Sequence, residues 1–140
     1  MSGACGPSCQ PRKLLTASRQ LRRNWTITRF RDYVLTPKVD GYRALHLVNR
    51  HGGRLIEIQL RTPRQDTWAN MVEKVAQIFP GIRVGAGPAE LRELFAASSE
   101  LYAIKEGSIQ IGEVSRSQLD DIEGAIDRAD TFLRELLDEP

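Results

Sequence analysis

The stretch ALHLVNRHGGRLIEIQLRT, residues 44–62, contains two runs of alternating apolar residues on either side of Gly52-Gly53. A Gly-Gly pair between two such runs is a strong signal of a two-residue β-hairpin turn. A turn at these glycines also fixes how the strands pair, because strand register follows from the turn. The expected pairs are Arg50 with Leu55, Val48 with Glu57, Leu47 with Ile58, His46 with Gln59 and Leu45 with Leu60.

The alternation sorts the hairpin into two faces, since side chains along a strand point to opposite sides in turn. One face is apolar and is expected to form the core: Leu45, Leu47, Ile56, Ile58 and Leu60. The other face is polar and brings together His46, Glu57, Gln59 and Arg61. A polar face of this kind is either a solvated outer surface or a functional site, and the pattern alone leaves both readings open.

Before the hairpin, residues 11–24 form a basic stretch with weak helical character, and residues 25–33 mix β-branched and aromatic residues in a way that favours a strand. After it, Thr62-Pro63 with Gln65 is typical of a helix start. The apolar positions expected on that helix are Trp68, Met71, Val72, Val75 and Phe79, and Pro80-Gly81 ends it.

The rest of the chain is expected to be mainly helical. Gly85 and Gly87 are read as a turn rather than a phosphate-binding loop, and Pro88 starts a helix with the apolar stripe Leu91, Leu94, Phe95 and Leu101. Residues 108–114 are expected to form a short strand. Ser117 is expected to cap a last helix, whose stripe is Leu119, Ile122, Ile126, Ala129, Leu133 and Leu136.

Charge is divided unevenly along the 140 residues. Residues 1–65 hold 13 Lys and Arg against 3 acids, a net charge of +10, whereas residues 66–140 have a net charge of −8. The first half is therefore expected to meet an anion, for which nucleotide phosphate, RNA or an acidic protein would fit. Few aromatic residues accompany the arginines, so RNA has only weak support.

Several classes are excluded by the composition. No apolar run approaches the roughly 18 residues of a membrane span, and the N-terminus lacks the apolar core of a signal peptide, so we expect a cytoplasmic protein. Cys5 and Cys9 have the spacing C-x3-C, which is not that of a thioredoxin-type redox site. They are expected to be reduced thiols rather than metal ligands.

Residues 29–73 resemble the RelA/SpoT alarmone synthetases, which make (p)ppGpp. The family carries a stretch like R-x-K-D-Y-I-x-x-P-K-x-x-G-Y-x-S-L-H, then E-I-Q-I-R-T and a helix with W-A. This chain has RFRDYVLTPKVDGYRALH at 29–46, IEIQLRT at 56–62 and TWANMVE at 67–73. VGAGPAELRELFAASSELYA, residues 84–103, looks like the following loop and helix, so the likeness covers roughly residues 20–105.

The resemblance implies an α+β fold of the nucleotidyltransferase-like type, an α/β mixed sheet flanked by helices. It implies transfer of the β,γ-pyrophosphate of ATP to the 3′-hydroxyl of GDP or GTP, with Mg²⁺ as cofactor. Glu57 matches the glutamate that helps hold Mg²⁺ and orients or deprotonates the 3′-hydroxyl. Tyr42 matches the tyrosine that stacks on the acceptor guanine, and Lys38 and His46 match positions near the acceptor phosphates. Gln59 and Arg61 would support Glu57, and Arg29 and Arg31 would lie close to the nucleotides.

Two features depart from the family pattern. Asp40 stands where the family has asparagine or a similar residue. Farther upstream, the family has an R-x-K…K segment that grips the ATP phosphates and a D-x-x-G-x-R strand whose aspartate is the second Mg²⁺ ligand, and residues 1–28 match neither. We therefore expect a truncated synthetase domain with weak or no activity by itself. An exposed apolar sheet face or sheet edge, with marginal stability or self-association, would follow.

The expected organisation is a basic, flexible segment over residues 1–22, a partial synthetase domain over 23–112 and an amphipathic helix over 113–140. The alternative to a synthetase is a non-catalytic module that binds guanine nucleotides and acts as a regulator. A homo-oligomer through the sheet edge or the C-terminal helix fits either reading.

Overall fold

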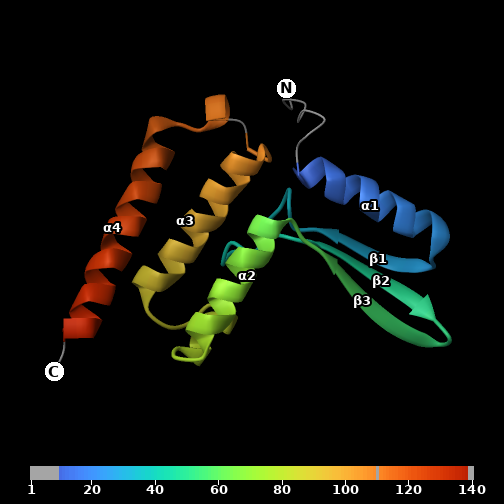
Figure 1. Cartoon of the computed structure of the whole chain (residues 1–140), viewed down its shortest axis with the longest axis horizontal. Helices are drawn as coiled ribbons and strands as arrows, with labels where there is room; N and C mark the ends of the chain where they lie inside the picture. The colour runs from blue at the N-terminus through green and yellow to red at the C-terminus, as the bar shows by residue number, and fades with distance from the viewer. Residues whose placement is uncertain (1–9, 110, 139–140) are drawn as a thin grey trace.

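A computed structural model describes residues 10–109 and 111–138 (Figure 1). In chain order the elements are α1 (Gln10–Asn24), β1 (Ile27–Asp32), β2 (Leu45–His51), β3 (Arg54–Leu60), α2 (Pro63–Ala76), the 3₁₀ turn η1 (Pro80–Val84), α3 (Ala89–Glu106), the 3₁₀ turn η2 (Ile111–Glu113) and α4 (Arg116–Asp138). Figure 1 shows α1 lying along the sheet, while α2, α3 and α4 form a group at the opposite end of the molecule. The α+β class is confirmed.

The sheet has the strand order β1-β2-β3, and both pairs are antiparallel rather than mixed. The hairpin turns at Gly52 and Gly53, whose φ angles of 56° and 75° lie in the left-handed region that favours glycine. Every strand pair expected from the Gly-Gly turn is present, so the register is confirmed. The same register places His46 opposite both Gln59 on β3 and Arg31 on β1.

Helix α1 covers the apolar face of the sheet. Leu45 and Leu47 are fully buried there, against partly buried leucines of α1. The outer strand is less protected, because Ile56 keeps 48% of its surface exposed. The expectation that Ile56 belongs to the core is therefore wrong, since α1 packs over β2 and leaves the β3 edge open.

The segment from residue 10 onward forms α1, which confirms its helical character. Because α1 packs on the sheet, residues 10–22 do not lie free of the domain. The wider division of the chain at residues 22 and 112 stays a prediction, and Cys5 and Cys9 lie outside the described residues.

Helix α2 begins as its sequence indicates. The Thr62 hydroxyl accepts a hydrogen bond from the Gln65 amide, and the Gln65 side chain accepts one from the Thr62 amide, which together form a capping box. The helix ends at Ala76, before Phe79, but Phe79 still packs against the core of the helical group. That core is built from Trp68, Ala69, Val72, Ile82, Leu91 and Phe95.

Two expectations for the C-terminal region are wrong. Residues 108–114 contain the 3₁₀ turn η2 instead of a strand, because no neighbouring strand in the described part of the chain offers them a ladder. Helix α4 is capped by Ser115 rather than Ser117: the Ser115 hydroxyl accepts from the Gln118 amide, and the Gln118 side chain accepts from the Ser115 amide. Within the described residues no helix is long and apolar enough to cross a membrane.

Candidate functional site

The polar face of the sheet gathers side chains from all three strands. β1 contributes Arg29 and Arg31, β2 contributes His46, and β3 contributes Glu57 and Gln59. These five residues were singled out from the sequence, and the antiparallel register brings them to one side. The face opposite α1 is therefore the candidate site.

Tyr42 reaches this face from a tight turn between β1 and β2. The Gly41 amide donates to the Lys38 carbonyl at 2.9 Å, and the Tyr42 amide donates to Asp40 Oδ1 at 3.0 Å. Gly41 has a φ of 96°, and a Cβ at that position would lie only 2.9 Å from the Ser99 Cβ. A glycine is required here both by backbone conformation and by the close approach of α3.

A buried polar clamp fastens this turn to α3. Arg43 donates to the Ser99 hydroxyl at 3.0 Å and to the Val34 carbonyl at 2.8 Å, and the Ser99 hydroxyl donates to the Gly41 carbonyl. Burial lowers the pKa of Arg43, while the charges of Glu100 and Glu106 raise it. Sequence reasoning missed both Arg43 and Ser99. Arg43 lies inside the motif that carried the resemblance, but no local pattern marks Ser99.

The hydroxyl of Tyr42 is held by three neighbours. It lies 2.8 Å from His46 Nε2 and 3.2 Å from Gln59 Oε1, and it accepts from Arg61 Nη2 at 3.2 Å. Arg61 also donates to Gln59 Oε1 at 2.6 Å. The structure thus brings together four of the predicted site residues, and three of them restrain the ring of the fourth, Tyr42.

Glu57 is joined to the same network through one of its two oxygens. Its Oε1 lies 3.0 Å from His46 Nδ1 and accepts from Gln59 Nε2 at 3.0 Å. Within residues 10–109 and 111–138, its Oε2 makes no hydrogen bond, and the side chain is 51% exposed. One carboxylate oxygen is therefore fixed by the protein while the other faces solvent.

His46 is held in a largely enclosed position, with only 16% of its side chain exposed. Burial lowers its pKa most, the Glu57 carboxylate raises it, and the charges of Lys38 and Arg61 lower it further. The net direction favours the neutral ring. A neutral imidazole donates through one nitrogen and accepts through the other, which suits a position between a carboxylate and a hydroxyl.

Two of the cavities that open on this face lie beside Tyr42 and beside the β1 arginines. One, of about 360 Å³, is lined by Lys38, Asp40, Tyr42, Arg61, Asn70 and Glu73, among others. The Lys38 Nζ and the Arg61 Cζ lie 5.1 and 5.3 Å from the Tyr42 ring centroid. The second cavity, of about 180 Å³, lies at the β1 side between Arg29, Arg31, His46 and Glu57. Both have cationic side chains in their walls, which can pair with an anionic ligand, beside one carboxylate or two.

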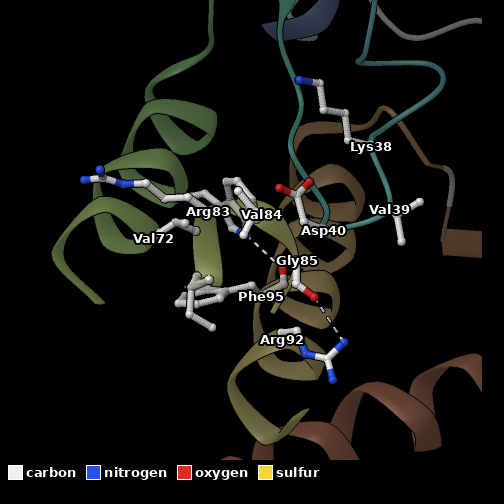
Figure 2. A pocket seen from close by; sticks show the side chains of 11 residues that line it. Lys38, Val39, Asp40, Val72, Arg83, Val84, Gly85, Arg92 and Phe95 are labelled. Atoms are coloured by element: carbon white, nitrogen blue, oxygen red, sulfur yellow. Dashed lines mark hydrogen bonds between the residues drawn. The ribbon is translucent and has the colours of Figure 1, made fainter. Parts of the chain in front are cut away.

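A third cavity, of about 290 Å³, adjoins the first and is shown in Figure 2. Its lining is mainly apolar and includes Val72, Val84 and Phe95, with Phe95 lying below Asp40 in Figure 2. Its two arginines already have partners: Arg83 binds Glu73 at 2.6 Å, and Arg92 donates to the Gly85 carbonyl at 3.4 Å. Gly85 and Gly87 form a turn at its rim, as the sequence indicates.

The carboxylates of the polar face decide whether this chain could hold Mg²⁺. In the described part of the chain no three His, Cys, Asp or Glu side chains come together as a metal site. Among the strand residues of the polar face in the described part of the chain, Glu57 is the one carboxylate, and its Oε2 makes no hydrogen bond. Mg²⁺ is commonly held by one or two carboxylates together with substrate phosphates, so Glu57 fits as a single protein ligand of a nucleotide-bound ion.

The hairpin and the elements around it match a known protein family. Residues 10–77 match the family model described as the region found in RelA/SpoT proteins. Over this segment the chain is similar to the RelA/SpoT proteins. The match includes α1, the three strands and nearly all of the polar face.

Curated relatives agree over the same part. GTP pyrophosphokinase YwaC of Bacillus subtilis is 40% identical over 57 residues, which cover 35% of this chain and 27% of that protein. An uncharacterized protein of Mycobacterium tuberculosis is 37% identical over 73 residues, covering 45% of this chain and 27% of its own length. The chain thus spans about a quarter of the length of the curated relatives it matches.

Solved structures show the same fold. The small alarmone synthetase 2 of B. subtilis superposes with a TM-score of 0.58 at 24% identity, covering 69% of this chain and 56% of that one. The small alarmone synthetase 1 of B. subtilis, bound to its product pppGpp, gives a TM-score of 0.55 at 23% identity, with coverages of 69% and 52%. The RelA/SpoT fold is thereby confirmed.

Proposed function

We propose that this chain forms the acceptor-nucleotide side of a (p)ppGpp synthetase site, in which GDP or GTP receives the β,γ-pyrophosphate of ATP on its 3′-hydroxyl. The observation that carries the proposal is the Tyr42 ring. Its hydroxyl is fixed by His46, Gln59 and Arg61, and its ring borders a 360 Å³ cavity between two cations. A fixed aromatic ring beside cations suits a nucleobase that carries phosphates.

Each site residue then has a chemical role. The guanine base stacks on Tyr42, and the Lys38 ammonium, exposed beside the cavity, meets the acceptor phosphates. Glu57 orients or deprotonates the 3′-hydroxyl through its free Oε2. Gln59 and Arg61 keep Tyr42 and Glu57 in place, because both are bonded to that network.

Mg²⁺ would be held at Glu57 Oε2 together with nucleotide phosphates. When bound, the ion supplies neutralisation of the phosphate charge that develops during transfer. The residues of this chain position the acceptor and its hydroxyl.

The donor nucleotide, ATP, would meet Arg29 and Arg31, which line the 180 Å³ cavity. Both guanidinium groups are exposed and would contact ATP phosphates. One carboxylate and two loosely held arginines are a sparse set for phosphoryl transfer, which depends on positioning and charge stabilisation. We therefore expect slow turnover by this chain.

A second candidate is a non-catalytic guanine-nucleotide-binding module with a regulatory role. Within the described residues the strand positions on the polar face supply one carboxylate, Glu57, and this favours the module over a complete synthetase site. Both candidates share the acceptor site and differ only in turnover.

Calorimetric titration with GDP and Mg²⁺ tests the shared site. The chain should bind GDP, and Tyr42→Ala should weaken binding about 10- to 100-fold, because one base–aromatic stack contributes roughly 1–3 kcal/mol. Leu35→Ala is the matched control: Leu35 lies in the same connection, is 77% exposed and lines neither polar-face cavity. A folded chain that ignores GDP, or a Tyr42→Ala chain that binds it equally well, contradicts the proposal.

Turnover separates the two candidates. Incubation with ATP, Mg²⁺ and GDP should yield product at far less than the ordinary range of about 1–10³ per second. Product that disappears in Glu57→Gln would favour the slow synthetase. GDP binding without any product would favour the binding module.

A further inference from the structure

We infer that Glu106 is a positioning residue of the acceptor site. Its buried carboxylate anchors the backbone beside Tyr42 and the backbone beside Arg61 to the end of α3, and it thereby sets the gap between the Tyr42 ring and the Arg61 guanidinium. The inference rests on the proposed function, since Tyr42 and Arg61 border the cavity assigned to the acceptor nucleotide. Glu106 lines neither that cavity nor the one beside the β1 arginines, so it acts through other residues.

The first link joins Glu106 to the residue that follows Arg61. Glu106 is the last residue of α3 and has only 6% of its surface exposed. Its Oε1 accepts a hydrogen bond from the Thr62 hydroxyl at 2.5 Å. Thr62 is itself 2% exposed and caps α2. The end of α3 is therefore fastened, through a buried contact, to the point where the chain leaves β3 and enters α2.

The second link joins Glu106 to the residue that follows Tyr42. Burial lowers the pKa of Arg43 most, and the charges of Glu100 and Glu106 raise it. Glu106 and Arg43 also line the same small cavity, together with Gly41 of the Tyr42 turn. Since an uncompensated charge in the interior is costly, the Glu106 carboxylate stabilises the guanidinium that clamps this turn to α3.

The two links act on two groups that border the same cavity. The Arg61 Cζ lies 5.3 Å from the Tyr42 ring centroid, and Arg61 Nη2 donates to the Tyr42 hydroxyl at 3.2 Å. Within the described residues the buried Arg61 Nε has no hydrogen-bond partner, so the guanidinium is not fixed at every donor by its own contacts. An anchored backbone beside each group keeps the two at one distance before the nucleotide binds, which reduces the freedom that binding must remove.

The gap can be measured without any nucleotide. The Arg61 guanidinium lies close enough to the Tyr42 ring for the ring to displace the chemical shift of the Nε–H proton, and Tyr42→Leu gives that signal without the ring. Glu106→Leu should move the Arg61 signal toward its position in Tyr42→Leu, because the backbone beside each group is released. Ile104→Ala is the matched control, since Ile104 is two residues away on α3 and packs against α4. An unchanged signal in Glu106→Leu, or an equal change in Ile104→Ala, overturns the inference.

A pair of substitutions separates positioning from stability. Thr62→Val takes this donor from the buried Glu106 carboxylate, whereas Thr62→Val/Glu106→Leu replaces both polar partners with apolar side chains. Replacing both partners of a buried hydrogen bond costs less stability than removing one, so the double variant should be no less stable than Thr62→Val. Both variants lack the Thr62 cap of α2, so the cap does not affect the comparison. The double variant also takes the place of Glu106→Leu if that chain does not fold.

GDP and inorganic triphosphate distinguish a changed gap from a general loss of structure. Glu106→Leu and the double variant should each weaken GDP binding about 3- to 10-fold, as one misplaced contact does, and triphosphate binding less than about 2-fold. Glu100→Gln is the charge control, because Glu100 also acts on Arg43 but bonds to Gln118 of α4; it should keep GDP affinity within about 2-fold. Equal losses for the two ligands, or wild-type GDP affinity in a stable double variant, contradict the inference.

The proposed function and the role of Glu106 fail separately. A folded chain that does not bind GDP refutes the proposed function, while the Arg61 signal of the free protein still decides whether Glu106 sets the gap. A chain that binds GDP but whose Arg61 signal is the same in Glu106→Leu refutes only the role of Glu106.

Discussion

The two ends of the polar sheet face differ in how firmly their side chains are held. At the Tyr42 end, Tyr42, His46, Gln59 and Arg61 are bonded to one another. At the β1 end, the Arg31 side chain makes one long contact of 3.5 Å to the carbonyl of Phe30, and the Arg29 side chain makes no hydrogen bond to any described residue. Both ends are cationic, but only one is preorganised.

The two ends therefore differ in how much their side chains must be ordered when a ligand binds. Groups that are fixed before binding lose little freedom when a ligand arrives, whereas exposed arginines must be ordered by the ligand itself. The Tyr42 end should therefore recognise a particular ligand shape. The β1 end should attract negative charge with little regard to what carries it.

The largest expected effect comes from the turn that presents Tyr42. Gly41→Ala combines a φ of 96° with a Cβ that would lie 2.9 Å from the Ser99 Cβ and 3.1 Å from the Phe95 carbonyl oxygen. The free energy of unfolding should fall by at least about 2 kcal/mol, measured by urea denaturation. Gly53→Ala is the control, because its φ is also positive but nothing lies within 4 Å. Equal losses in the two variants would show that α3 does not constrain the turn.

The polar clamp between the Tyr42 turn and α3 should contribute nearly as much to stability. Ser99→Ala leaves a partly buried Arg43 donor and the buried Gly41 carbonyl without their partner, and should lower the free energy of unfolding by about 1–3 kcal/mol. Ser98→Ala is the matched control one residue away, since its hydroxyl bonds only to the Leu94 carbonyl of its own helix. A Ser99→Ala chain as stable as Ser98→Ala would contradict the clamp.

Removing the loosely held cations should change binding without changing stability. Arg29→Ala/Arg31→Ala should weaken the binding of inorganic triphosphate about 10-fold and reduce its dependence on salt, because exposed charges act through screened attraction. GDP should lose less than triphosphate, as Tyr42 still holds its base. Titration of both ligands at two salt concentrations measures the difference, and an equal loss for both would remove the distinction between the two ends.

The smallest effect concerns pH. Because burial lowers the pKa of His46 in the folded state, the unfolded chain binds more protons once the pH falls through the ordinary histidine value of about 6.5. The contribution of His46 to stability should therefore decline as the pH falls from 7.5 to 5.5 and level off below the folded pKa. Urea denaturation of the wild type and of His46→Gln across this range isolates the contribution of His46 to the free energy of unfolding. If the free energies of the two proteins change with pH in parallel, the prediction is contradicted.

The hairpin and its site were predictable because short-range rules decide them. The Gly52-Gly53 turn fixes the register, and the register alone places His46 beside Gln59 and Glu57. The capping box at Thr62 likewise lies within four residues of sequence. Both features depend on residues that are close together in the chain, so the sequence alone predicts them.

What the sequence did not reveal depends on packing between distant segments. Ser99 is 58 residues from Gly41, and no pattern announces that contact. The exposure of Ile56 depends on where α1 lies rather than on strand alternation. The use of both His46 nitrogens appears only when the Tyr42 turn is seen folded over the sheet.

A nitrogen-15 amide NMR titration of the chain with GDP and Mg²⁺ tests the central claim most directly. Saturable shift changes should concentrate in residues 38–46, 57–61 and 68–73, which surround the Tyr42 cavity, and should be small in residues 27–31. Inorganic triphosphate should give the opposite map, strongest near Arg29 and Arg31. Shifts from GDP that cluster at the β1 end, or that are absent around Tyr42, would contradict an acceptor site on this face.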